Sequence, residues 1–183
     1  MAFHTYDGLD SPYGRQAMEL YDEAFPREGR KPDHIIAGMF AKKLSRLHVE
    51  VDGGEVSAMA IDGLLPESDW LVIDYLAVRK GKRGQGIGRT FVRELESWAR
   101  SGERKLAGLL LEAEADPGQE NVDRVRFWES CGFIATEYVH HYIWVPETYR
   151  AMYLPFDPDF QPSDRGESLF RHIERFHKKA FTR

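Results

Sequence analysis

The sequence predicts a single mixed α/β domain, and three observations lead to that expectation. Apolar residues repeat at helical spacing in some segments and alternate or run continuously in others. Two strand-like segments flank Asp52-Gly53-Gly54, which is typical of a hairpin turn. Two further apolar runs, 70–78 and 106–114, enclose a glycine-rich turn and a helical pattern. Strand, helix and strand in this order predict two parallel strands joined by a right-handed crossover.

The elements before the glycine-rich turn are two helices, a hairpin and a long apolar strand. Pro26 ends the first helix, and Asp33 is expected to cap the second. The expected ranges are 11–25 and 33–43 for the helices and 47–51, 56–65 and 70–78 for the strands.

The elements after the turn complete the sheet and end in a helix. The run at 106–114 is nearly continuously apolar, which predicts a strand buried on both faces. We expect residues 1–156 to form one domain, followed over 157–183 by a proline-rich connector and an amphipathic C-terminal helix. The expected ranges are 87–102, 121–130 and 168–181 for the helices and 106–114, 133–144 and 151–156 for the strands.

Composition narrows the function classes. The chain of 183 residues is 42% hydrophobic, which suffices for one core. Its net charge of −5 argues against nonspecific nucleic-acid binding and favours cationic small molecules or peptides as partners. The single cysteine, Cys131, excludes an internal disulfide and fits a reducing cytosol. The N-terminus lacks the apolar segment of a signal peptide, and no apolar run reaches membrane-spanning length. We therefore expect a cytoplasmic protein that binds neither nucleic acid nor membrane, and a homodimer is left open.

The most informative motif is the glycine-rich turn from Val78 to Arg89. A strand turns here into a helix N-terminus, where several backbone N–H groups lack partners and the helix dipole adds positive potential. A pyrophosphate is the natural ligand of such a turn. The glycine spacing differs from the Rossmann fingerprint and the P-loop, and leaves the pattern R-x-x-G-x-G from Arg83 to Gly88. A tight turn without a ligand is the simpler alternative.

A second motif follows the last long apolar run. It consists of an asparagine, an aromatic residue seven positions on, an acidic residue next to it, and a Gly-Phe pair. The residues at these positions are Asn121, Trp128, Glu129, Gly132 and Phe133. With the glycine-rich turn, this pattern resembles the GNAT superfamily of N-acetyltransferases, best over residues 45–145. The resemblance implies an α/β (α+β) fold with a mixed, mostly antiparallel sheet, a splayed parallel pair of central strands, and helices on both faces.

The resemblance also implies acetyl-CoA as the cosubstrate and assigns its binding residues. Backbone groups at the strand end would hydrogen-bond the pantetheine arm in the wedge between the parallel strands, at Leu76, Ala77 and Val78. Amides of the turn would hold the pyrophosphate, at Arg83, Gly84, Gln85, Gly86, Ile87, Gly88 and Arg89. Asn121 would contact the pantetheine end, and Trp128 would stand near the thioester sulfur. As alternatives, Asn121 caps its helix and Trp128 packs in the core.

Two departures from the superfamily pattern concern proton transfer. Val72 stands where many members have a glutamate base, and Trp128 stands where many have a tyrosine acid. A thiol has a reference pKa of about 8.5 and leaves as a thiolate with modest help, whereas an alkyl ammonium, at about 10.4, must first lose a proton. The missing acid is tolerable, but the missing base needs a substitute.

Asp74 is the candidate base, because it lies two residues past Val72 and should share its face of the strand. Glu112 and Glu114 end the neighbouring strand, where they could relay a proton through water or attract a cationic amine. The simpler alternatives are a pairing of Asp74 with a nearby arginine, and a solvated strand end for the two glutamates.

The acceptor is expected to bind between the loop from Phe25 to Pro32 and the C-terminal strands. Tyr138 and Tyr142 lie four residues apart and share a strand face with His140, so Tyr142 is a candidate replacement for the missing acid. Core packing is the alternative for at least one of the tyrosines. No spacing indicates a metal site, and attack on the thioester is expected to be direct, without a covalent role for the cysteine.

The sequence thus predicts an enzyme, an acetyl-CoA-dependent N-acyltransferase that moves an acetyl group to a primary amine of a small molecule or peptide. The alternative is a catalytically weak acyl-CoA-binding sensor or interaction module, which Val72 and Trp128 suggest. The carboxylate of Asp74 favours the enzyme. These patterns do not encode which amine is the acceptor.

Overall fold

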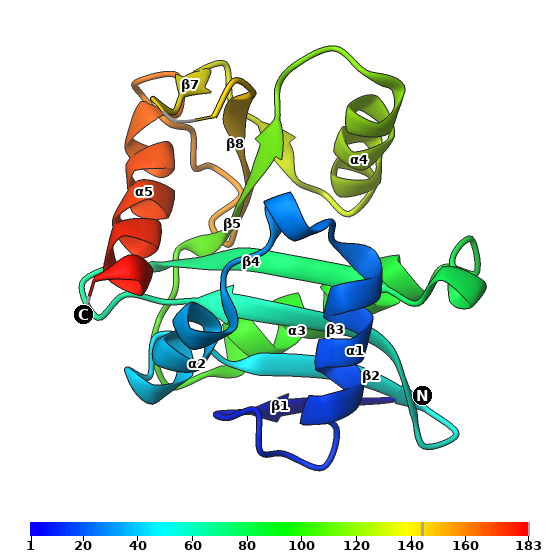
Figure 1. Ribbon diagram of the computed structural model, residues 1–183. Coiled ribbons are helices and arrows are strands. Elements are labelled where there is room, and N and C mark those ends of the chain that lie inside the picture. The colour runs from blue at the N-terminus through cyan, green and yellow to red at the C-terminus, as the bar shows by residue number, and fades with distance from the viewer. Residues whose placement is uncertain (144, 183) are drawn as a thin grey trace.

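One mixed sheet organises the molecule (Figure 1). The computed structural model describes residues 1–143 and 145–182, and eight strands of this part form the sheet in the order β1-β2-β3-β4-β5-β8-β6, with β7 paired to β8. The strands are β1 Ala2–Tyr6, β2 Leu47–Asp52, β3 Glu55–Gly63, β4 Trp70–Val78, β5 Gly108–Glu114, β6 Ile134–Ala135, β7 His140–His141 and β8 Thr148–Pro155. The helices are α1 Gly14–Ala24, α2 Asp33–Ala41, α3 Ile87–Ser101, α4 Gln119–Ser130 and α5 Glu167–Phe181.

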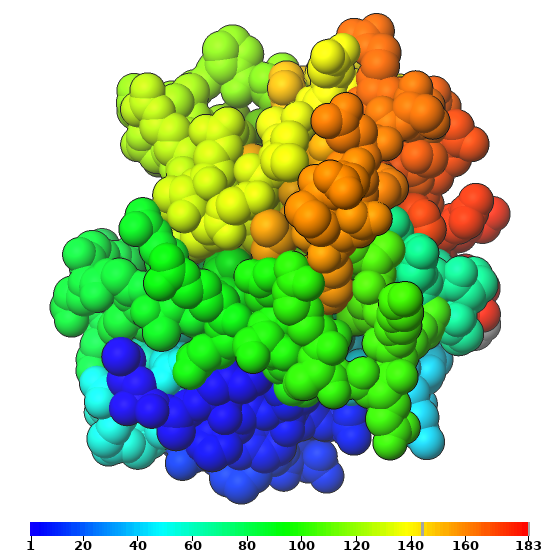
Figure 2. Space-filling view, turned by 180° about the vertical axis from the view of Figure 1, so that it is seen from behind, coloured from blue at the N-terminus to red at the C-terminus, as the bar shows by residue number. Residues whose placement is uncertain are grey.

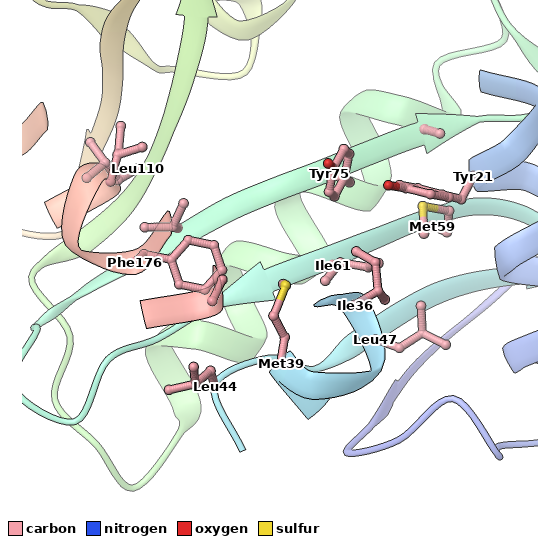
Figure 3. Close-up of a cluster of buried hydrophobic side chains, with 14 of the residues drawn as sticks. Tyr21, Ile36, Met39, Leu44, Leu47, Met59, Ile61, Tyr75, Leu110 and Phe176 are labelled. Carbon is pink, nitrogen blue, oxygen red and sulfur yellow. The ribbon is translucent and has the colours of Figure 1, made fainter. Parts of the chain in front are cut away.

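Helices cover both faces of the sheet, as predicted. α1, α2 and α5 pack on one face around a core that contains Tyr21, Met39 and Phe176, and Figure 3 shows these side chains among those of the strands. α3 packs on the opposite face through Phe91 and Leu95, with α4 beside it. Each helix presents one apolar stripe to the sheet, so the layers follow from the helical periodicity of the sequence.

The predicted parallel pair is present, and its strands separate early. β4 pairs with β5 only over Trp70–Val72 and Gly108–Leu110, and the other strand pairs of the described residues are antiparallel. Beyond these residues β5 turns away from β4 at a steep angle (Figure 1). The two strands therefore enclose a wedge, and the last six residues of β4 have no strand partner on that edge.

A β-bulge in β4 lies beside the wedge. The register between β3 and β4 shifts, and Asp74 is the extra residue without a partner on β3. The bulge changes the alternation of the strand, so that Tyr75 packs in the same core as Val72. Asp74 contacts Lys31 on this face, which is the face that we expected from its position relative to Val72.

The C-terminal strands differ from the expectation. In place of one strand over 133–144, only the two-residue strands β6 and β7 pair with β8, and Trp144 lies outside the described residues. Between them the Tyr138 N–H donates to the Arg165 carbonyl at 3.0 Å, so the chain leaves the ladder to bond the segment before α5. Long-range hydrogen bonding therefore overrides a local strand pattern here.

Two N-terminal details also differ. The sequence reasoning missed β1, a five-residue edge strand whose residues are only partly buried and carry a weak pattern. Pro32 rather than Asp33 stands at the N-cap of α2, and no side chain caps this helix. Asp33 is the first helical residue, where a negative charge still interacts favourably with the helix dipole.

α4 lies at the periphery of the molecule, and none of its residues is fully buried. Seen from behind, the chain around α4 lies above α3 and the glycine-rich turn (Figure 2). The turn itself is exposed from Arg83 to Gly86, whereas Ile87 is already buried. The N-terminus of α3 is therefore open to a ligand from solvent.

Candidate active site

The glycine-rich turn has the backbone that an anion site needs. Gly84 and Gly86 have φ angles of +77° and +80°, in the left-handed region that favours glycine. Gly86 holds the N-cap position of α3, no side chain caps this helix, and its first turn contains no acidic residue. A Cβ at Gly86 would meet no atom within 4 Å, so the space in front of this backbone is open.

The same turn offers unpartnered donors. Within the described residues, the backbone N–H groups from Gly84 to Arg89 donate no hydrogen bond, and the helical ladder begins where Thr90 N–H donates to the Gly86 carbonyl at 3.1 Å. The Arg83 guanidinium donates to the Val78 carbonyl at 2.9 Å and ties the turn to the strand end. Free amides at the positive end of a helix dipole fit a phosphate group.

Asn121 and Trp128, two residues of the second motif, both make contacts that stabilise the fold. Asn121 is the third residue of α4, and Gly118 holds the N-cap, so the capping alternative is wrong. The Asn121 side chain donates to the Asp116 carbonyl at 3.1 Å and fixes the loop before the helix. The Trp128 ring is partly buried and packs edge-on against Phe133, with the ring centroids 5.1 Å apart.

Asp74 forms a buried ion pair on the face opposite α3. Its Oδ1 accepts a hydrogen bond from Lys31 Nζ at 2.6 Å, and the two side chains are 2% and 7% exposed. The ammonium lies 5.0 Å from the ring centroid of Tyr75 and 5.8 Å from that of Phe176. The other carboxylate oxygen, Oδ2, is buried and has no hydrogen-bond partner among the described residues. The simpler alternative, a pairing of Asp74 with a nearby arginine, is wrong as to the partner, because the structure pairs Asp74 with a lysine from the loop between α1 and α2.

Two tyrosine hydroxyls hold this lysine in place. Both Tyr21 and Tyr75 accept a hydrogen bond from the backbone N–H of Lys31, at 3.1 Å and 3.0 Å. Burial, followed by the nearby Asp74 charge, raises the pKa of Tyr75 to about 12. The hydroxyl therefore stays neutral near physiological pH and serves as a hydrogen-bonding group.

Glu112 forms the centre of a second network. Its Oε1 accepts a hydrogen bond from His177 Nε2 at 3.0 Å, and its Oε2 accepts one from the Tyr142 hydroxyl at 2.9 Å. Burial opposes ionisation of Glu112, but the bonds from His177 and Tyr142 outweigh it and hold the pKa of the carboxyl below its usual range. Burial and the adjacent Glu112 charge raise the pKa of Tyr142 far above its usual range, so its hydroxyl keeps its proton.

His177 connects the two networks. It comes from α5, and its Nδ1 lies 3.9 Å from Asp74 Oδ1 while Nε2 bonds Glu112. Asp74 and Glu112 stand on β4 and β5 beyond the last pair of those strands, so the imidazole bridges the point where the wedge opens. One ring therefore spans the two strands on the face opposite the α3 turn.

Comparison with known proteins decides the family. The sequence model of the acetyltransferase (GNAT) family matches residues 14–133, which include the glycine-rich turn and the second motif. The chain belongs to the GNAT family. A search of curated proteins finds no significant match.

Solved structures show the same GNAT fold. A protein from Bacteroides thetaiotaomicron described as a GNAT-family acetyltransferase has 15% identity over 100% of both chains, with a TM-score of 0.74. The ribosomal-protein-S18-alanine N-acetyltransferase of Escherichia coli has 20% identity, covers 89% of this chain and 98% of its own, and has a TM-score of 0.62. A protein of Bacillus anthracis strain Ames described as a streptothricin acetyltransferase, in complex with acetyl coenzyme A, has 20% identity over 62% of this chain and 63% of its own, with a TM-score of 0.51.

In this GNAT domain, two predicted acceptor residues lie outside the Glu112 network. Phe25 packs on the Tyr75 ring, with the centroids 5.0 Å apart. Glu114 forms an ion pair with Arg124 at 3.7 Å and lines a cavity of about 320 Å³ beside α4. The two glutamates that the sequence placed on one strand face therefore have different surroundings.

The aromatic side chains that the sequence placed on one strand face, Tyr138, His140 and Tyr142, lie together in the GNAT domain. The Tyr138 hydroxyl lies 3.2 Å from His140 Nδ1, and the rings of His140 and Tyr142 are 4.5 Å apart. His140 stacks on Phe170 of α5 at 4.4 Å. This packing positions Tyr142 for its bond to Glu112, so the segment after α4 acts together with the C-terminal helix.

Sequence reasoning missed Lys31 and His177. Lys31 lies in the expected acceptor loop, but no local pattern links it to a carboxylate 43 positions away. His177 lies beyond the part that the GNAT model matches, and its position next to the apolar stripe of a helix is a weak signal. Among the described residues, no group of three or more His, Cys, Asp and Glu side chains could hold a metal ion. No described helix is long and apolar enough to cross a membrane.

Proposed function

We propose that this GNAT protein is an N-acetyltransferase that uses acetyl-CoA and a primary amine of a small molecule or peptide. One observation carries the proposal: where β4 and β5 part, the unpartnered amides of the α3 turn follow the end of β4, and the carboxylates of Asp74 and Glu112 lie on the opposite face of the sheet. A pyrophosphate fits the first group, and a cationic amine fits the second.

The residues of the turn are suited to hold CoA. The exposed amides of Gly84, Gln85 and Gly86 would bind the pyrophosphate, and the free edge of β4 from Leu76 to Val78 would bind the pantetheine arm. When bound, the thioester supplies an acyl group activated toward attack by an amine. The protein's own contribution is to orient the amine and accept its proton. Transfer is direct in this proposal, because the single thiol is half-buried and burial raises the pKa of Cys131.

Calorimetric titration followed by a thiol-release screen tests the proposal. Acetyl-CoA and CoA should bind the purified protein, and CoA thiol should appear with at least one amine in a panel of polyamines, amino sugars and peptides with free amino groups. The N-acetylated form of each acceptor is the matched control and should release no thiol. Failure of acetyl-CoA to bind would overturn the proposal.

The same experiment separates the enzyme from a binding module. The Asp74–Lys31 ion pair is the observation that favours a module, because it occupies the carboxylate expected to serve as base. Binding of acetyl-CoA without transfer to any amine would support that second function.

A further inference from the structure

The C-terminal helix brings an imidazole to the acceptor side of the wedge. His177 lies on α5, beyond residues 14–133 that define the family match, and its side chain is 20% exposed. It stands between Asp74 on β4 and Glu112 on β5. The family motifs therefore do not account for this residue, although it lies where β4 and β5 part.

The partner of His177 determines which ring nitrogen carries the hydrogen. The pKa of Glu112 is held below its usual range, so this carboxyl is an ionised group that can only accept hydrogen bonds. His177 Nε2 lies 3.0 Å from Glu112 Oε1 and must therefore be the donor. In a neutral imidazole the other nitrogen, Nδ1, is then an acceptor.

Two acceptor atoms therefore have no donor among the described residues, namely His177 Nδ1 and Asp74 Oδ2. His177 Nδ1 is 3.9 Å from Asp74 Oδ1, too far for a hydrogen bond, and Asp74 Oδ2 is buried with no partner among the described residues. Asp74 is 2% exposed, and a buried carboxylate oxygen without a donor costs free energy. Lys31 already compensates the charge of Asp74, and a protonated amine would supply the N–H donors that Oδ2 and the imidazole lack.

We propose that Asp74 and His177 form the subsite for the acceptor ammonium, and that His177 Nδ1 takes its proton. Glu112 is a positioning residue that fixes the ring, and Tyr142 positions Glu112 through the second carboxylate oxygen. Lys31 donates to Asp74 Oδ1, the oxygen nearer His177, and leaves Oδ2 for the incoming amine. The inference rests on the proposed function and deepens it, since it names the binding groups for a cationic primary amine.

In the proposed transfer, the acceptor ammonium loses two protons and the thioester loses its C–S bond. His177 takes one proton from the ammonium, and the neutral nitrogen attacks the carbonyl carbon and forms the new N–C bond. The C–S bond breaks with its electron pair on sulfur. The second proton lost by the nitrogen ends on that sulfur, and the imidazolium releases its proton to solvent. The products are the N-acetyl amine, CoA thiol and one proton.

Several other groups contribute to the pH dependence of the site. Asp74 and Tyr75 face the imidazole region from β4, Glu112 faces it from β5, and Lys31 faces it from the α1–α2 loop. Tyr142 acts on Glu112 from the segment after β7. A substitution at His177 must therefore be judged against a histidine that contacts none of these groups.

His172 supplies that control. It lies on the same helix, and its Nδ1 is 2.9 Å from the Ser68 hydroxyl, away from both carboxylates. We compare His177→Gln with His172→Gln by melting temperature, acetyl-CoA titration, and kcat/KM against pH for an amine found in the screen. His177→Gln should fold and bind acetyl-CoA like the wild type, lose about 100-fold in kcat/KM, and lose the limb of the pH profile that imidazole protonation produces. His172→Gln should retain the kcat/KM of the wild type and the same limb of its pH profile.

A measurement without turnover examines the same assignment. Nitrogen NMR shifts of the His177 ring in the protein alone should indicate hydrogen on Nε2 and a bare Nδ1, and Glu112→Gln should weaken this preference. Hydrogen on Nδ1 in the wild type would overturn the inference, as would a folded His177→Gln with the activity and pH profile of the wild type. A wild type that acetylates no amine would overturn both this inference and the proposed transferase, whereas a silent His177→Gln in an active enzyme overturns only the assignment of His177.

Discussion

The two sides of the β4–β5 wedge are built by different means. On the side of α3, the candidate cofactor site consists of backbone amides from one continuous segment, Gly84 to Arg89. On the opposite side, the candidate acceptor site consists of side chains from distant parts of the chain. These are Lys31, Asp74, Glu112, Tyr142 and His177.

This difference separates what the two sites require. A backbone site depends on local conformation, so glycines at the right positions suffice, and neighbouring side chains are free to vary. A side-chain site depends on the packing of five segments, so each charge must find a partner when the fold closes. Substitutions should therefore affect cofactor binding on one side, and stability together with acceptor chemistry on the other.

The largest effect is expected from Gly86→Val, which tests the backbone side. A β-branched residue at a φ of +80° is strained by roughly 1–3 kcal/mol, and its side chain would fill the open space in front of the amides. Acetyl-CoA binding measured by calorimetry should be abolished. Gly81→Val is the control, since Gly81 also has open space around it but no positive φ. Normal binding by a folded Gly86→Val would refute the pyrophosphate site.

Asp74→Asn tests the side-chain side. The substitution leaves the Lys31 ammonium buried and unpaired, which should cost about 3–5 kcal/mol of stability, and kcat/KM should fall about 100-fold while acetyl-CoA still binds. A loss in kcat would favour Asp74 as the base predicted from the sequence, whereas a rise in the acceptor KM would favour ammonium binding.

The double variant Lys31→Met with Asp74→Asn separates stability from chemistry. It removes both charges, so urea unfolding should show stability restored toward the wild type. Activity should stay low. Recovery of activity together with stability would reduce Asp74 to a structural role.

A pH-dependent group on the α3 face must be distinguished from the acceptor chemistry. The Glu50 carboxyl is 1% exposed, and burial together with the nearby Glu94 raises the pKa of Glu50 to about 7. The folded state then binds this proton more tightly than the unfolded state, so stability is highest below about pH 4.5 and declines as pH rises toward about 7. Glu50→Gln should remove this decline and add on the order of 3 kcal/mol above pH 7. Urea unfolding of both proteins at pH 5 and pH 8 measures how the free energy of unfolding changes with pH. An equal change in the wild type and in Glu50→Gln would contradict this assignment.

A smaller effect is expected at the edge of the acceptor network. Tyr142→Phe removes the hydroxyl that donates to Glu112 at 2.9 Å, and the loss of one bond to a charged group should lower kcat/KM about 10-fold. Tyr149→Phe is the control, because the Tyr149 ring packs 5.5 Å from that of Tyr142 on the same side. Unchanged kcat and KM in Tyr142→Phe for every acceptor would remove Tyr142 from the site.

Cys131→Ala should have the smallest effect on either side. The thiol is half-buried with a raised pKa, so it is a poor nucleophile, and direct transfer does not use it. Activity with the best acceptor should stay within about twofold of the wild type. An inactive variant that still folds and binds acetyl-CoA would require a covalent intermediate instead.

The sequence alone predicted the parts whose signals are local. The crossover from β4 through α3 to β5, the turn at Gly84 and Gly86, and the face of Asp74 each follow from spacing along a short stretch of chain. Hydrogen bonds and periodicity within a segment depend mainly on its own residues, so such patterns can be interpreted without the rest of the molecule.

Only the tertiary structure determined which side chains meet in the candidate acceptor site. The bulge at Asp74 depends on the register with β3. The strand expected over 133–144 is interrupted because the Tyr138 N–H donates to the Arg165 carbonyl instead of to a neighbouring strand. Lys31 meets Asp74 across 43 positions, and His177 meets Glu112 across 65. A buried charge selects its partner by proximity after folding, and sequence separation carries no information about that proximity.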